Sequence, residues 1–98
     1  MTEIYSFEFY QGGMLETQET GIYPKYIFIY YTYQGKNFKT RRINAQSSIV
    51  KGKVSRKGEQ LFYYEFFTEK QELLIYLIVD GVQSEKPIQV DGYDIISD

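Results

Sequence analysis

Apolar and polar side chains alternate along much of this chain with a period of two, which is typical of β-strands that bury one face. Segments with this pattern, each bounded by Gly, Pro, Asp or Asn, are 4–10, 15–20, 25–33, 36–43, 49–56, 59–67, 73–79 and 88–90. The pattern therefore predicts about eight short strands. Residues 1–98 are expected to form a single domain.

Tight turns are predicted between these strands. Candidate turn sequences are Gln11-Gly12-Gly13, Gln34-Gly35, Lys57-Gly58, Asp80-Gly81 and Asp91-Gly92. An Asp-Gly pair between apolar residues is a strong hairpin signal. Sequential strands joined in this way predict an all-β fold. We expect a small antiparallel meander, closed as a barrel or folded into a two-layer sandwich.

One segment is compatible with a short helix. Residues 68–71 resemble a capping box, and the leucines and isoleucines of 73–78 also have helical spacing. A helix over 69–80 would, however, be apolar on all sides, and the Asp80-Gly81 turn favours a strand before it. We therefore predict a strand, with a helix over 69–80 as the alternative.

The Gln34-Gly35 turn predicts which side chains share a face. With these two residues as the loop, Tyr30 lies opposite Lys39 and Phe28 opposite Arg41, next to Tyr26. The other face, which carries Ile29, Tyr31 and Tyr33, is expected to be core. The hairpin thus predicts a surface of cations beside aromatic rings.

The Lys57-Gly58 turn predicts a second surface of the same kind. A two-residue loop there sets Lys53 opposite Phe62 and Lys51 opposite Tyr64. Cations beside rings can hold an acidic protein surface or stack nucleic-acid bases. The candidate partner-binding residues of the two hairpins are Tyr26, Phe28, Tyr30, Lys39, Arg41, Lys51, Lys53 and Tyr64.

Charge is strongly segregated along the sequence. Residues 1–19 hold four acidic residues and no basic one, residues 20–58 hold nine basic residues and no acidic one, and residues 59–98 hold nine acidic and two basic residues. The net charge is only −2. The basic middle segment either presents a binding surface or lies beside the acidic segments and neutralises them.

Composition excludes several kinds of chemistry. The chain has no Cys and no His, so disulfides, thiol catalysis, Cys/His zinc sites and imidazole catalysis are absent. We expect no enzyme activity, no cofactor and no metal. No signal peptide is evident and no apolar run is long enough to span a bilayer, so we expect a cytoplasmic protein that does not contact membranes. The scarcity of Ala and the abundance of Ile, Lys, Tyr and Phe are typical of an AT-rich genome, such as that of a low-GC bacterium, its phage or its mobile elements.

These observations predict a binding function. We expect a small non-catalytic protein-binding module, such as an inhibitor, an immunity protein or an accessory protein of a phage or mobile element, which docks an acidic partner surface. Eleven Tyr residues suit such an interface. A single-stranded nucleic-acid-binding protein is the alternative, although the pI of about 5.1 disfavours it. A structural subunit that self-assembles, basic middle against acidic end, is a third hypothesis.

Overall fold

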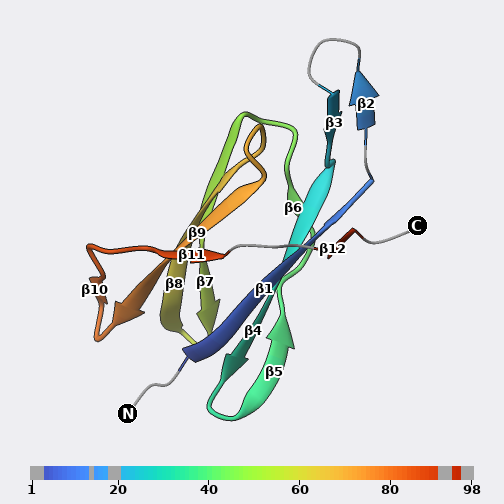
Figure 1. Cartoon of the computed structure of the whole chain (residues 1–98). Coiled ribbons are helices and arrows are strands. Elements are labelled where there is room, and N and C mark those ends of the chain that lie inside the picture. Colours follow the sequence, from blue (N-terminus) through green and yellow to red (C-terminus); the bar gives the residue numbers. More distant parts are fainter. Residues whose placement is uncertain (1–3, 14, 18–20, 91–93, 96–98) are drawn as a thin grey trace.

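Strands make up the regular structure of the described residues (Figure 1). The computed structural model describes residues 4–13, 15–17, 21–90 and 94–95. The strands are β1 (Ile4–Gly12), β2 (Leu15–Thr17), β3 (Gly21–Tyr23), β4 (Tyr26–Tyr33), β5 (Lys36–Lys39), β6 (Ile43–Asn44), β7 (Ile49–Arg56), β8 (Glu59–Phe67), β9 (Glu72–Val79), β10 (Val82–Gln83), β11 (Ile88–Val90) and β12 (Asp94–Ile95). The described ranges contain no helix that could cross a bilayer.

The strands form two main sheets. The first sheet has the order β12-β1-β4-β5, and β6 pairs with β4 as well. The second has the order β10-β9-β8-β7, and β11 pairs with β9. All of these pairs are antiparallel except β1 with β12. Between the strands described here, no pairing joins one sheet to the other, so the fold is a two-layer sandwich and not a closed barrel. The short pair β2–β3 extends beyond the two sheets (Figure 1).

Aromatic and aliphatic side chains together fill the space between the sheets. Phe7 meets Phe62 edge to face with ring centroids 5.1 Å apart, and Phe9 meets Phe66 in the same way at 5.5 Å. The Tyr31 ring contacts Phe62 at 5.2 Å. Each of these contacts joins a strand of the first sheet to β8, so aromatic packing holds the two layers together.

Three of the predicted two-residue turns are present. Gln34-Gly35, Lys57-Gly58 and Asp80-Gly81 each have positive φ at both positions, with values between 49° and 82°. Such turns match the twist of antiparallel strands. The predicted face of Ile29, Tyr31 and Tyr33 is buried as expected. Asp91-Gly92, the remaining Asp-Gly pair, lies outside the described residues.

Residues 72–79 form the strand β9, so the alternative of a helix over 69–80 is wrong. β9 pairs with β8 on one side and with β10 and β11 on the other. Leu73 and Ile75 are fully buried against the sandwich core. Pairing on both edges and burial of alternate residues therefore override the local helical spacing.

The prediction of a turn at Gln11-Gly12-Gly13 is also wrong in part. β1 continues through Gly12, which is the register partner of Tyr26. A Cβ atom on Gly12 would lie 2.5 Å from ring atoms of Tyr26. Gly12 is therefore required for close approach of the Tyr26 ring, and only Gly13, with φ of 61°, has the backbone of a turn.

The register of the β7–β8 hairpin differs from the prediction by one residue. Lys53 lies opposite Tyr63 instead of Phe62, and Lys51 opposite Glu65 instead of Tyr64. The cause is a β-bulge opposite Val54 and Ser55, which leaves Leu61 as an extra residue on β8. Because side chains alternate along a strand, one extra residue exchanges the faces of β8.

Candidate functional site

Four aromatic rings form a row on the outer face of the first sheet, the face turned away from the second sheet. They belong to Tyr10 on β1 and to Tyr26, Phe28 and Tyr30 on β4, and we call them the aromatic row. The register places Tyr10 beside Phe28, and alternate residues of β4 point to the same side. The Tyr10 and Tyr30 rings meet edge to face with centroids 4.7 Å apart, and those of Tyr26 and Phe28 do so at 5.4 Å.

Two cations lie over this row. The Lys39 ammonium is 5.1 Å from the centroid of Phe28 and 5.9 Å from that of Tyr30. The Arg42 guanidinium carbon is 4.3 Å from the centroid of Tyr26. A cation within about 6 Å of a ring is attracted by its π-electrons. The aromatic row therefore holds both cations in place on the surface.

Gly12, at the end of β1, fixes the position of the Tyr26 ring at one end of the aromatic row. Tyr26 is on the outer face but only 8% exposed. Its ring lies close against Gly12, where any side chain would clash. A ring laid over a glycine of the neighbouring strand covers backbone that would otherwise face water. Tyr26 therefore acts as a fixed platform for Arg42 and offers little free area of its own.

Arg41 departs from its predicted position. Tyr30 lies opposite Lys39 as expected, but β5 ends at Lys39, so Arg41 has no register partner on β4. Thr40 closes the strand instead: its backbone N–H donates to the Ile29 carbonyl, and its side-chain oxygen accepts from the Ile29 N–H, both at 3.0 Å. Arg41 is exposed just beyond this point, beside Arg42 in the sequence.

One carboxylate borders the aromatic row. Glu8 is the register partner of Tyr30, so Glu8, Tyr30 and Lys39 form a line across three strands. The Tyr10 hydroxyl donates a hydrogen bond of 3.1 Å to Glu8. A hollow of about 540 Å³ adjoins this line and is bounded by Thr32 among others. The surface therefore combines half-buried rings, cations and a hollow, with a carboxylate at one border.

The outer face of the second sheet has a more balanced charge. Lys51 lies opposite Glu65, and Lys53 opposite Tyr63. The Tyr63 hydroxyl donates to Glu65 at 3.2 Å, and its ring lies 5.7 Å from that of Tyr76. Burial and the nearby Glu65 carboxylate raise the pKa values of Tyr63 and Tyr76. Lys51 and Lys53 thus share their face with an acidic and tyrosine-rich group.

Tyr64 lies inside the sandwich, not on this outer face. It is 9% exposed and belongs to the core, where burial raises the pKa of its hydroxyl. A Cβ atom on its register partner Gly52 would come within 2.6 Å of the Tyr64 hydroxyl oxygen. The predicted contribution of Tyr64 to a binding surface is therefore wrong, and the bulge at Leu61 is the reason.

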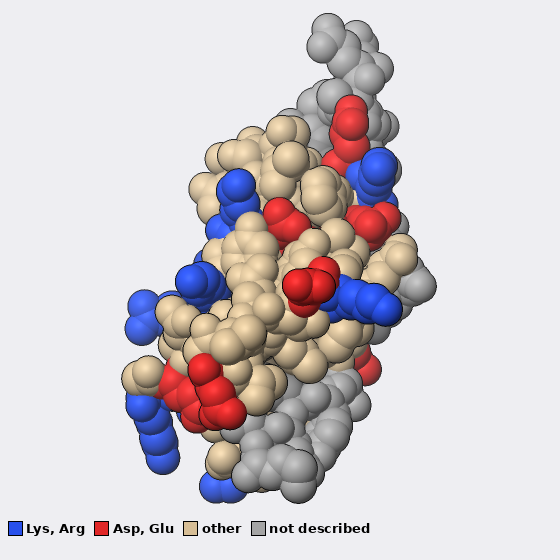
Figure 2. Space-filling view, turned by 90° about the vertical axis from the view of Figure 1, so that its left-hand side faces the viewer, with Lys and Arg blue, Asp and Glu red and all other residues tan. Residues whose placement is uncertain are grey.

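The nine cations of the middle segment do not form one patch. Lys39 and Arg42 lie over the aromatic row, Lys51 and Lys53 lie on the second sheet, and another group lies at the tips of two hairpins. On the side of the molecule in Figure 2, cations lie along the left-hand border and also at the right, where carboxylates lie beside them. Folding therefore mixes the two signs of charge on this side, although the sequence separates them.

Two residues of this surface, Tyr10 and Arg42, were not among those predicted from the sequence. Tyr10 occupies an outward position on β1 that the alternation with Phe9 already indicates. Arg42 could not be placed, because strict alternation from Lys39 and Arg41 would point it to the other face. The end of β5 at Lys39 removes that constraint.

The described residues contain no cluster of three or more acidic side chains that could hold a metal ion. Comparison of the chain with protein-family models, with curated proteins and with solved structures finds no match.

Proposed function

We propose that this protein is a non-catalytic binding module that docks an acidic segment of a partner protein on the outer face of its first sheet. The observation that carries the proposal is the pair of cations held over the aromatic row, Lys39 over Phe28 and Tyr30, and Arg42 over Tyr26. Arg41 adds an exposed positive charge beside them. An inhibitor, an immunity protein or an accessory protein of a phage or mobile element would use such a surface.

The same contacts favour a protein over a single-stranded nucleic acid. Binding of bases needs free ring faces for stacking. Here Lys39 and Arg42 already lie over the rings of the aromatic row. Glu8, at the border of the aromatic row, would repel a phosphate backbone and an acidic protein segment alike, so it favours neither ligand. Positioned cations beside half-buried rings instead suit carboxylates and apolar side chains of a protein segment.

The second sheet is not part of the proposed surface. Lys51 and Lys53 lie next to Glu65, whose carboxylate accepts a hydrogen bond from Tyr63. An acidic partner would meet that carboxylate as well as the lysines. The binding surface therefore consists of the aromatic row with Lys39, Arg41 and Arg42.

Affinity capture with paired variants tests the proposal. The protein is immobilised and exposed to a lysate of an AT-rich bacterium, with and without nuclease. The binding variant is Lys39→Glu/Arg41→Glu. The control is Lys70→Glu/Lys86→Glu, which makes the same change of charge at exposed positions on other parts of the chain. We expect a protein that the wild type and the control retain after nuclease and that the binding variant loses.

Two results would contradict the proposal. Release of all bound material by nuclease would show that nucleic acid is the ligand. Equal retention by the wild type and by Lys39→Glu/Arg41→Glu would show that another surface makes the contact.

A further inference from the structure

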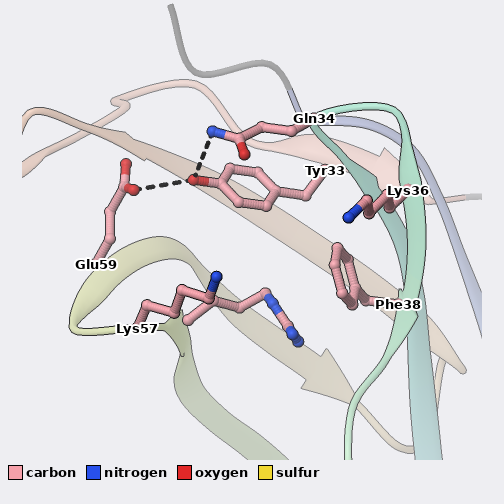
Figure 3. Close-up of a pocket in the computed structure, with 7 residues that line it drawn as sticks. Tyr33, Gln34, Lys36, Phe38, Lys57 and Glu59 are labelled. Carbon is pink, nitrogen blue, oxygen red and sulfur yellow. Dashed lines mark hydrogen bonds between the residues drawn. The ribbon is translucent and has the colours of Figure 1, made fainter.

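Two hairpin tips from different sheets meet around a hollow at one end of the sandwich (Figure 3). The tips are the Gln34-Gly35 turn of the first sheet and the Lys57-Gly58 turn of the second. The hollow has a volume of about 420 Å³, which is within the range of small-molecule sites. We call it the hairpin hollow.

A hydrogen-bonded chain forms one wall of the hairpin hollow. The Tyr33 hydroxyl donates to Glu59 at 2.9 Å and accepts from the Gln34 amide at 3.3 Å (Figure 3). The hydrogen bond to Glu59, followed by burial, raises the pKa of Tyr33. The phenol therefore stays protonated. Glu59, which is the only acidic residue among the described residues of the lining, already accepts a hydrogen bond with one oxygen.

Cations form the rest of the polar lining. The Arg56 guanidinium carbon is 3.6 Å from the centroid of the Phe38 ring, so the guanidinium is stacked on the ring. Stacking leaves the N–H groups at the edge of a guanidinium available as donors. Lys36 and Lys57 enter from the two facing hairpins (Figure 3). With Glu59, the lining carries three positive charges and one negative charge.

We propose that the hairpin hollow binds the phosphoryl group of a small phosphorylated molecule. The excess of positive charge in the lining matches a phosphate dianion better than a singly charged carboxylate. Three phosphoryl oxygens can accept from the Arg56 fork and from two ammonium groups together, whereas a carboxylate has only two oxygens. The volume leaves room for a sugar or a base attached to the phosphate. The site is separate from the aromatic row and does not depend on the proposed function.

Amide NMR of the full chain tests the site with two probes, inorganic phosphate and adenosine 5′-monophosphate, at constant ionic strength. We expect saturable shifts of the Gly35 and Gly58 amides with one or both probes. If the nucleotide binds more tightly than inorganic phosphate, the ligand is a phosphorylated metabolite. If the two probes bind equally, the phosphate group alone is sufficient for binding. The variants Arg56→Gln and Lys36→Gln should each weaken binding about tenfold, because each removes a charged donor.

The control is Lys86→Gln, which removes one positive charge at an exposed position outside both the hollow and the aromatic row. It should bind both probes as the wild type does. Lys36 is exposed, so its replacement tests the site without disturbing the core. The proposal is overturned if neither probe gives saturable shifts, or if Lys86→Gln weakens binding as much as Arg56→Gln and Lys36→Gln do.

Discussion

Gln11 is a polar side chain placed in the core. It is fully buried on β1, and neither its amide nitrogen nor its amide oxygen has a hydrogen-bond partner among the residues that the structure describes. A buried polar group without a partner costs about 1–3 kcal/mol. The position therefore lowers the stability of the fold.

Replacing this amide by an apolar group of similar shape should stabilise the protein. We expect Gln11→Met to raise the free energy of unfolding by about 1 kcal/mol, since it removes the desolvation cost and keeps the volume. Urea unfolding measures the change. The control Gln60→Met, at an exposed position of β8, should change it by less than about 0.5 kcal/mol. A larger loss of stability in Gln11→Met than in the control would show that the Gln11 amide makes hydrogen bonds in the folded protein.

On the outer face of the second sheet, Glu65 influences the pKa values of two tyrosines. Burial is the largest cause of the raised pKa values of Tyr63 and Tyr76, and the Glu65 carboxylate is the next. Because these pKa values are raised above the ordinary 10.0, the protonated phenols stabilise the fold below that pH. This contribution is lost as pH rises through the folded-state values.

The variant Glu65→Gln should lower the pKa values of Tyr63 and Tyr76 part of the way toward 10.0, because the effect of burial remains. NMR of carbon-labelled tyrosines, recorded during a titration to alkaline pH, measures both pKa values. Glu69→Gln, at an exposed position, serves as the control and should leave them unchanged. Identical tyrosine titrations in the wild type and in Glu65→Gln would argue against this account.

The hairpins show how far the sequence determines the strands. The β4–β5 register was predicted correctly up to Lys39, because Gln34-Gly35 forms the two-residue turn that its sequence indicates. The β7–β8 register was predicted incorrectly, although Lys57-Gly58 forms the same kind of turn. The difference is the bulge at Leu61. The bulge allows two consecutive residues, Leu61 and Phe62, to be buried together. Their burial depends on packing against the opposite sheet, and the local sequence pattern does not reveal that packing.

Contact between β1 and β4 at Gly12 offers a test at the level of strand pairing. Gly12→Ala should cost about 1–3 kcal/mol of stability, because the new Cβ atom would displace the Tyr26 ring. In the background Tyr26→Ala, the same change should cost much less. Urea unfolding of the four proteins of this double-mutant cycle gives the coupling. Equal costs in the two backgrounds would mean that the Tyr26 ring does not constrain Gly12.

At the scale of the molecule, the sandwich determines which charges come together. The sequence predicted three rings of the aromatic row, since Tyr26, Phe28 and Tyr30 were placed on one face of a hairpin with Lys39. It could not predict the hairpin hollow, because Tyr33 and Glu59 are 26 residues apart and belong to different sheets. The segregation of charge along the chain was likewise a poor guide to the surface, since β8 sets Glu65 opposite Lys51 and Glu59 opposite Arg56.

The affinity of the captured protein partner for the variant Lys39→Glu/Arg41→Glu tests the central claim most directly. We expect the dissociation constant to rise at least about 100-fold, because each reversal removes an attraction and adds a repulsion at the interface. The free energy of unfolding should fall by less than about 1 kcal/mol, since both side chains are exposed. An unchanged dissociation constant, or unfolding of the variant, would contradict the assignment of this face as the binding surface.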